Sequence, residues 1–137
     1  MIAKLSRIVA IGTAIAVAAA CARDERVIFV FVHMSDSKAT PFVAETSDAQ
    51  TIEAARAEIS KPLPTRNLFV RGLIERGDGG INAPWRWHFV PSSWKMAGGS
   101  IEKCDGEPTV LEQHLDEWLE RSHEYCPWNW RVSSERR

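Results

Sequence analysis

The sequence contains few of the short motifs by which enzymes are usually recognised. It has no Gly-rich loop of the kind that cradles phosphates, and Ser92-Ser93 lies in no nucleophile-elbow or oxyanion-hole pattern. Its cysteines form no C-x-x-C pair and its histidines no H-x-x-x-H pair, so the strong zinc signatures are missing too. The sequence therefore identifies no reaction, and we expect a non-enzymatic domain.

Long apolar runs are also scarce, and the one present stands at the N-terminus. Lys4 and Arg7 lead into an apolar, Ala-rich run over residues 8–20, which is shorter than the roughly 20 residues that a membrane-spanning helix needs. A basic start, a short apolar run and small residues before a cleavage point are typical of a secretory signal peptide. We predict such a signal over residues 1–21, and hence an exported protein.

Two ways of processing this signal fit the residues around Cys21. Ala18-Ala19-Ala20-Cys21 resembles a lipobox, in which Cys21 becomes the lipidated first residue and anchors the protein in the cell envelope. Ala20-Cys21-Ala22 also fits a small-residue cleavage site, which leaves a soluble periplasmic or extracellular protein. The lipid-anchored form is favoured, and in both forms Cys21 is lost as a partner for internal disulfides.

A basic excess is absent. The chain has 17 Lys and Arg residues against 18 Asp and Glu residues. Removing Lys4 and Arg7 with the signal leaves 15 basic residues against 18, a net charge of −3. Nucleic acids select a basic patch and anionic membranes a polybasic face. We therefore expect no nucleic-acid partner, and membrane contact only through the lipid anchor.

Cysteine is limited to three residues, of which Cys104 and Cys126 remain after export. An oxidising compartment favours disulfides, and two cysteines allow a single pairing, so a Cys104–Cys126 disulfide is predicted. Closing a loop of about 22 residues stabilises the fold by roughly 3 kcal/mol in the chain-entropy model.

The first part of the exported chain predicts a strand and a helix. The continuous β-branched and aromatic run Val27–Val32 is typical of a central strand buried on both faces, and Pro41–Ala44 is a candidate edge strand. Ser47, with Gln50 three residues later, forms a capping-box pattern. It begins a predicted helix whose apolar stripe consists of Ile52, Ala55 and Ile59. Ser60-Lys61-Pro62 ends this helix.

The middle of the chain predicts an antiparallel hairpin. Asn67–Glu75 has the strand pattern, and Gly72 within it indicates a bulge or a close backbone approach. Trp85–Val90 alternates and places Trp85, Trp87 and Phe89 on one face. Ala97–Gly99 is a predicted turn. Two further short strands are expected at Ser100–Lys103 and Arg131–Ser134.

A second helix is predicted between the two cysteines. Asp105 is its expected cap and Pro108 fits its first turn. Its wide apolar stripe turns His114 and Trp118 inward, together with Val110, Leu111, Leu115 and Leu119. The predicted fold is a single α+β domain over residues 27–134, with an antiparallel sheet of about four strands covered by two helices and one disulfide.

The order of these segments and their amino-acid sequences resemble those of a family of small secreted or lipid-anchored domains. The family is named after the N-terminal domain of a slime-mould calmodulin-binding protein. The resemblance covers roughly Val27 to Val132 and rests on Ile52/Ala55/Arg56, Val70-x-Gly72-x-Ile74, Asn82-x-Pro84-Trp85-x-Trp87-His88-Phe89, Glu102-x-Cys104-Asp105, Val110-x-Glu112-x-His114-Leu115-Asp116, and Cys126-Pro127-Trp128 with Arg131.

The resemblance implies a fold but no catalytic residues. The family name suggests calmodulin as a partner, yet calmodulin targets are typically basic amphipathic helices. The solvent face of the second predicted helix is acidic, through Glu112, Asp116, Glu117 and Glu120. We therefore do not expect calmodulin binding of this chain.

Three functional hypotheses follow. The first is a binding module without catalysis or cofactor, whose unknown peptide, protein or glycan ligand contacts the Trp128–Trp130 loop with Arg86, His88 and Arg131 nearby. The second is a zinc- or thiol-dependent site that uses His88, Cys104, His114 and Cys126. The third is an inhibitor of an envelope protease. The first hypothesis is favoured, because in an oxidising compartment Cys104 and Cys126 form a disulfide and leave no free thiols for the second.

Overall fold

The computed structural model describes residues 25–99 and 102–137. The predicted signal peptide and Cys21 lie outside the described residues. The described elements follow one another in the order β1 (Val27–His33), β2 (Phe42–Thr46), α1 (Ala49–Ile59), a 3-10 helix (Leu63–Thr65), β3 (Phe69–Arg76), β4 (Trp87–Phe89), β5 (Lys95–Ala97), a second 3-10 helix (Glu102–Cys104), α2 (Pro108–Gln113), α3 (Leu115–Arg121), β6 (Glu124–Tyr125) and β7 (Trp130–Arg136).

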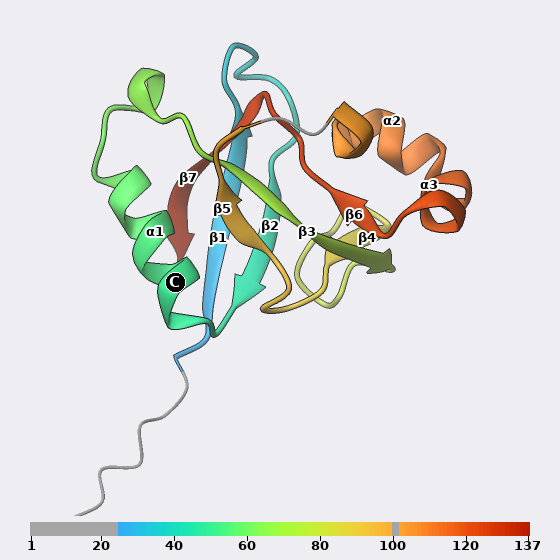
Figure 1. The fold of residues 1–137 in the computed structure, drawn as a ribbon, viewed down its shortest axis with the longest axis horizontal. Helices are drawn as coiled ribbons and strands as arrows, with labels where there is room; N and C mark the ends of the chain where they lie inside the picture. Colours follow the sequence, from blue (N-terminus) through green and yellow to red (C-terminus); the bar gives the residue numbers. More distant parts are fainter. Residues whose placement is uncertain (1–24, 100–101) are drawn as a thin grey trace, which may run out of the picture.

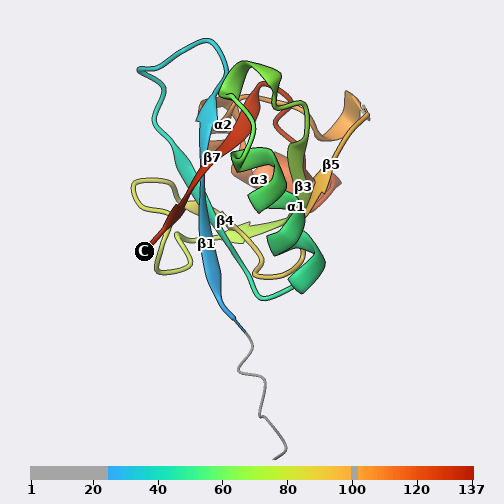
Figure 2. The same ribbon diagram turned by 90° about the vertical axis from the view of Figure 1, so that its left-hand side faces the viewer.

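The strands form two antiparallel sheets, flanked by helices at opposite sides (Figures 1 and 2). The first sheet has the order β2-β1-β7, and in the second β3 pairs with β4, β5 and β6. Helix α1 packs against β7 and β5, and α3 packs against β3. The predicted α+β class and antiparallel pairing are confirmed, with the strands divided between two sheets.

Strand β1 is central, as predicted, but it is fully buried on one face only. Phe29 and Phe31 lie in the core, whereas Ile28 and Val30 on the other face are half-buried. The prediction of burial on both faces was wrong, because α1 makes its main strand contacts with β7 and β5 and leaves that face of β1 partly open.

The two ends of the domain meet beside α1. In the β1–β7 pair, Ile28 lies opposite Arg136, so the first and last strands run together at one end of the molecule (Figure 1). Arg56 of α1 donates to Glu25 at 2.7 Å and to Glu135 at 2.5 Å. These hydrogen bonds, with those to Glu135 first, raise the pKa of Arg56 above its usual value. The arginine thus holds both chain ends against the helix.

Helix α1 begins one residue later than the capping-box pattern indicated. The N-cap is Asp48, whose carboxylate accepts hydrogen bonds from the backbone N–H and hydroxyl of Thr51. Ser47 instead bonds Ser92, through both its N–H and its hydroxyl. The predicted apolar stripe is confirmed by buried Ile52 and Ala55, and the helix ends before Pro62, as expected.

The predicted hairpin is confirmed, and it carries much of the core. Strands β3 and β4 pair antiparallel, and Trp85, Trp87 and Phe89 are all buried. Asn82 connects the hairpin to the other sheet, since its side chain accepts from Val43 N–H of β2 and donates to the carbonyl of Trp87, both at 2.8 Å.

Gly72 of β3 allows a close approach of two backbones. A Cβ atom added there would lie 2.4 Å from Cβ and 2.6 Å from Cα of Trp94. Trp94 is fully buried, and its indole N–H donates to the carbonyl of Glu45 at 2.8 Å. The prediction of a close approach is therefore confirmed.

One strand near Cys104 was missed and one local prediction was wrong. The missed strand, β5, occupies Lys95–Ala97, because Val70 and its neighbours in β3 pair with it. It takes Ala97 from the predicted turn, and Gly98 and Gly99 follow outside any strand. The described part of the strand predicted over residues 100–103 belongs to a 3-10 helix instead. The last predicted strand is confirmed as β7, which is longer than expected because it pairs along β1.

The second predicted helix is divided at His114. Its backbone there (φ −120°, ψ 30°) ends α2 and precedes α3. Leu111 is buried as predicted and Trp118 packs on the core, but Val110 and His114 are exposed. Their inward prediction was wrong, because the break interrupts the stripe that a single straight helix would carry.

Among residues 25–99 and 102–137 no helix is long and apolar enough to cross a membrane.

Candidate functional site

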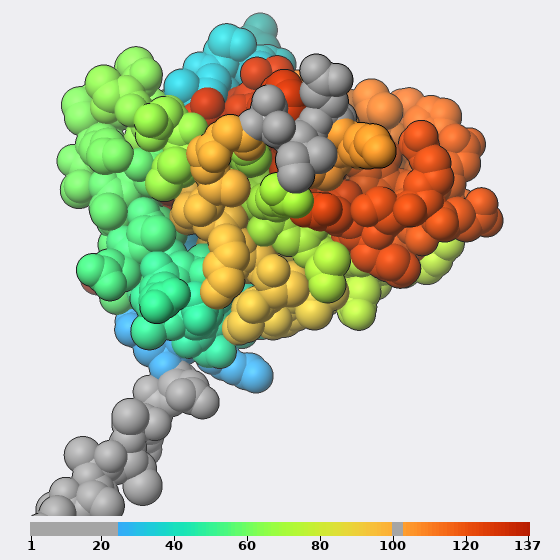
Figure 3. All heavy atoms as spheres, in the orientation of Figure 1, coloured from blue at the N-terminus to red at the C-terminus, as the bar shows by residue number. Residues whose placement is uncertain are grey.

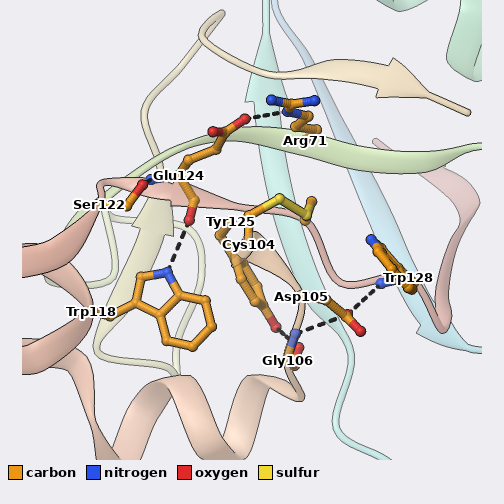
Figure 4. Close-up of a disulfide and its surroundings, with 10 residues drawn as sticks. Arg71, Cys104, Asp105, Gly106, Trp118, Ser122, Glu124, Tyr125 and Trp128 are labelled. Atoms are coloured by element: carbon orange, nitrogen blue, oxygen red, sulfur yellow. Dashed lines mark hydrogen bonds and ion pairs between the residues drawn. A yellow bond between two sulfur atoms is a disulfide. The ribbon is translucent and has the colours of Figure 1, made fainter. Parts of the chain in front are cut away.

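The predicted disulfide between Cys104 and Cys126 is present, and both cysteines are buried (Figure 4). Their Cα atoms lie 5.1 Å apart, and the N–H of Cys126 donates to the carbonyl of Cys104 at 2.8 Å. Phe69 and Trp128 pack around the bond. The disulfide therefore lies inside a small apolar cluster.

Hydrogen bonds fix the chain on both sides of this disulfide (Figure 4). Asp105 does not cap α2 as predicted, because its carboxylate accepts from the backbone N–H of Gly106 and Trp128. The hydroxyl of Tyr125 donates to the carbonyl of Gly106 at 2.7 Å. Burial raises the pKa of Tyr125 well above its usual value, and the charges of Glu107 and Asp105 act in the same direction. Tyr125 is therefore a buried donor that joins β6 to the segment preceding α2.

A pocket of about 330 Å³ opens where the end of β1 meets the start of α2. We call it the Glu107 pocket. Its walls come from the β1–β2 loop, the β3–β4 connection, the first turn of α2 and the start of β7, and its lining residues are His33, Asp36, Ala39, Thr40, Trp85, Glu107, Pro108, Thr109 and Trp130. His33, one of these lining residues, ends β1. That end of β1 is far from the chain termini (Figure 2).

Glu107 is held in this pocket by two aromatic partners. Its Oε2 accepts from the indole N–H of Trp130 at 3.0 Å, and its Oε1 lies 3.5 Å from Nε2 of His33. The β1–β7 pairing places His33 directly opposite Trp130, with the two rings edge to face at 5.4 Å. The carboxylate orientation is therefore fixed by strand register.

The hydrogen bonds of His33 define the tautomer of its imidazole ring. Its Nδ1 accepts from the backbone N–H groups of Ser35 and Asp36, at 3.1 and 3.0 Å. An imidazole nitrogen that accepts carries no proton, so the proton lies on Nε2 and faces Glu107. Both nitrogens are thus engaged, and His33 is a positioning group rather than an available base.

The charge of the Glu107 pocket is negative. Glu107 and Asp36 are its two acidic lining residues, and among the described residues no Lys or Arg lines the pocket. Oδ1 of Asp36 also accepts from the backbone N–H of Lys38 at 3.0 Å. The side chain of Glu107 is 43 % exposed, so its carboxylate remains accessible although it bonds Trp130. Trp85 and Trp130 are 8 % and 2 % exposed, which leaves their ring faces inside the core. The pocket thus offers charged oxygen atoms within apolar walls.

The residues predicted to contact a ligand are distributed over separate parts of the molecule. Trp130 lines the Glu107 pocket. Arg86 is exposed and pairs with Glu112 of α2 at 2.8 Å, beside a different hollow between the β3–β4 hairpin and the helices. His88 has a 13 % exposed side chain, whose Nδ1 lies 2.8 Å from the carbonyl of Gly77.

Trp128 and Arg131 hold the chain rather than extend outward. The ring of Trp128 packs 6.4 Å from that of Phe69, and its buried Nε1 has no hydrogen-bond partner among the described residues. Arg131 donates to the carbonyls of Arg66, Trp128 and Trp130. Burial lowers the pKa of Arg131, opposed by the charge of Glu58. In the loop between the disulfide and β7, only Asn129 is exposed.

The four residues of the alternative zinc or thiol site have other partners. Cys104 and Cys126 are bonded to each other, His88 binds a carbonyl of its own hairpin, and exposed His114 lies 3.5 Å from Glu117. In the described part of the chain, no three His, Cys, Asp or Glu side chains are grouped closely enough to hold a metal ion.

Sequence reasoning missed His33, Asp36 and Glu107. His33 and Asp36 follow the predicted strand Val27–Val32 in no recognisable motif, and Glu107 precedes the helix-starting Pro108 without any pattern of its own. No local pattern links these residues, since no Trp lies within ten positions of His33 or Glu107 in the sequence. Their meeting depends on the β1–β7 register, which spans 97 residues of sequence from His33 to Trp130.

Similarity to known proteins was found at the level of a domain family. Comparison with curated proteins found no match, and comparison with solved structures found none. A family model described as the BP-74 N-terminal domain matches residues 25–137, which include every described strand and helix. It is the calmodulin-binding-protein family whose resemblance was noted in the sequence. The chain belongs to the BP-74 N-terminal domain family.

Proposed function

We propose that this protein is an exported, lipid-anchored binding module that takes a cationic group of a peptide or protein ligand into the Glu107 pocket. The ligand group is the ammonium of a lysine or the guanidinium of an arginine. The observation that carries the proposal is the pair of acidic residues, Glu107 and Asp36, that line a hollow with no described Lys or Arg in its lining.

The shape and polarity of the pocket support a single side chain as ligand. Its volume of about 330 Å³ is at the small end of the range for ligand sites. Proteins that bind sugars by stacking need an open aromatic face, and the faces of Trp85 and Trp130 are buried. A lysine or arginine side chain fits such a pocket, because its charged group pairs with a carboxylate and its aliphatic part packs against the apolar walls.

The placement of the pocket supports presentation from a membrane. If Cys21 carries the lipid, three residues separate it from Glu25, which is tied to Arg56. Strand β1 leads away from that end, and its seven residues extend for about 20 Å to His33 at the pocket. A lipid at Cys21 therefore directs the pocket away from the membrane surface, towards soluble ligands.

The chemistry of the pocket supports binding rather than catalysis. Both nitrogens of His33 have partners, so its ring is not free to take a proton from a substrate. Cys104 and Cys126 form the disulfide. The protease-inhibitor hypothesis receives no specific support from the disulfide-tethered loop, where only Asn129 is exposed.

The test uses the mature protein and a tripeptide probe. We expect acetyl-Gly-Lys-Gly-amide to shift the NMR signals of the Trp130 indole N–H and of residues lining the pocket, and the norleucine analogue to shift neither. Glu107→Gln keeps an oxygen that accepts from Trp130 but removes the charge, so binding should weaken about tenfold or more, as for a lost charged hydrogen bond.

Glu112→Gln is the matched control, because this α2 carboxylate pairs with Arg86 outside the pocket and its loss should leave binding unchanged. Equal binding of the lysine and norleucine peptides would contradict the proposal. So would unchanged affinity in Glu107→Gln.

A further inference from the structure

A second hollow, of about 310 Å³, lies between the 3-10 helix at Cys104 and the end of α3, lined by Lys103, Trp118, Arg121 and Ser122. We call it the Trp118 hollow. In Figure 3 the orange segment that leads into α2 lies against the red-orange chain of α3. No lining residue is shared with the Glu107 pocket.

The indole of Trp118 is a fixed wall of this hollow (Figure 4). Its Nε1 donates to the carbonyl of Glu124 at 2.9 Å, and its ring stands edge-on to Tyr125 at 5.7 Å. Gly106 touches the far edge of the ring, because an added Cβ there would lie 3.1 Å from it. Trp118 is nevertheless only half-buried, so part of a preorganised aromatic surface faces solvent.

The two cations beside this ring differ from their neighbours in having no ion-pair partner among the described side chains. Nearby arginines on β3 are paired, Arg71 with Glu124 and Arg76 with Asp116. Lys103 and Arg121 form no ion pair or hydrogen bond with any described side chain, and no described carboxylate lines the hollow. In a chain with more acidic than basic residues, this is a local positive site next to an apolar surface.

We propose that the Trp118 hollow docks an acidic segment of a partner protein, with a carboxylate between Lys103 and Arg121 and an adjacent apolar side chain on the indole. Carboxylates pair with arginine through two parallel hydrogen bonds, and aromatic rings supply rigid contact area at low entropic cost. Two cations are too few for a nucleic acid. A bare phosphate would leave the indole unused.

The test measures the affinity of the mature protein for acetyl-Leu-Glu-Leu-Glu-amide by NMR titration, with acetyl-Leu-Gln-Leu-Gln-amide as the neutral probe. We expect the acidic peptide to shift the indole signal of Trp118 and to bind more weakly as salt rises. Lys103→Gln and Arg121→Gln should each weaken binding about twofold to fivefold, as expected for exposed ion pairs. The double variant should reduce the affinity by about tenfold.

Arg26→Gln is the matched control, since this exposed arginine near the chain start should not affect binding. Circular dichroism of each variant confirms that it is folded. Equal binding of the two peptides would overturn the proposal, as would shifts that map away from Trp118, an unaltered affinity in the double variant, or tighter binding of inorganic phosphate than of the acidic peptide. The result does not depend on the Glu107 pocket, because Glu107→Gln should bind this peptide normally.

Discussion

Replacing Gly72 by alanine tests how closely β3 packs against the chain that joins β4 to β5. The added methyl group would lie 2.4 Å from Cβ and 2.6 Å from Cα of Trp94, distances that no real side chain tolerates. Trp94 is not free to retreat, because it is fully buried, contacts Phe29 and Phe31 edge to face, and bonds the carbonyl of Glu45. One of the two backbones must move.

The cost follows from this geometry. Overpacking a core by one methyl group typically costs about 1–3 kcal/mol, and the upper end applies where backbone rather than a side-chain tip is in the way. With an unfolding entropy of about 2.1 cal/mol/K per residue, a domain of roughly 110 residues loses about 13 °C in Tm for 3 kcal/mol. Thermal unfolding followed by circular dichroism measures this shift, and urea unfolding gives the free energy.

Gly98→Ala is the control for the glycine substitution itself. Its added Cβ meets only Cδ2 of Leu68, at 3.1 Å, which is the end of a flexible side chain. We expect its Tm to stay within about 4 °C of the parent protein, since a Gly→Ala change at a compatible position is worth less than about 1 kcal/mol. If Gly72→Ala melts as high as Gly98→Ala, the close approach to Trp94 is refuted.

Three further predictions concern the disulfide, the helix cap and the anchor. Replacing Cys104 and Cys126 by alanine should destabilise the domain by about 3 kcal/mol, because the closed loop has a sequence separation of 22; an unchanged Tm would show that the bond adds nothing. Hydrogen bonds from Lys95 and Thr51 lower the pKa of Asp48 from 3.8 to about 2, so its contribution to stability is complete above pH 3.8 and is lost as the pH falls through about 2. Carboxyl NMR titration checks this, and a midpoint near 3.8 would contradict it. Cys21→Ser should move the protein from the membrane fraction to the soluble fraction, and retention in the membrane would exclude the lipid anchor.

The elements predicted correctly are those that local pattern controls. Alternation placed Trp85, Trp87 and Phe89 on one buried face, since successive side chains of a strand point to opposite sides. The errors have a common cause in tertiary contacts. Helices as short as α2 and α3 gain most of their stability from packing, so the break at His114 cannot be derived from helix propensity.

The candidate sites show the same division. Trp130 was singled out from the sequence, but it lines a pocket for a reason that the sequence does not contain. Its role depends on the β1–β7 register, which sets it opposite His33, and on α2, which brings Glu107 to its indole N–H. Arg86 and Arg131 were predicted to act with it. The structure instead gives them Glu112 and backbone carbonyls as partners.

The sequence alone determined the family, the α+β class and the Cys104–Cys126 pairing, because these depend on local periodicity, on short ordered motifs and on a cysteine count that allows one bond. Tertiary structure decided which charged groups lie together. Pairing between the strands at the two ends of the chain places His33 beside Trp130, and Glu107 contacts both. Lys103, before the helical segment, lies beside Trp118 and Arg121 near its end. Contacts between residues distant in sequence depend on register and packing, and neither is visible in a local pattern.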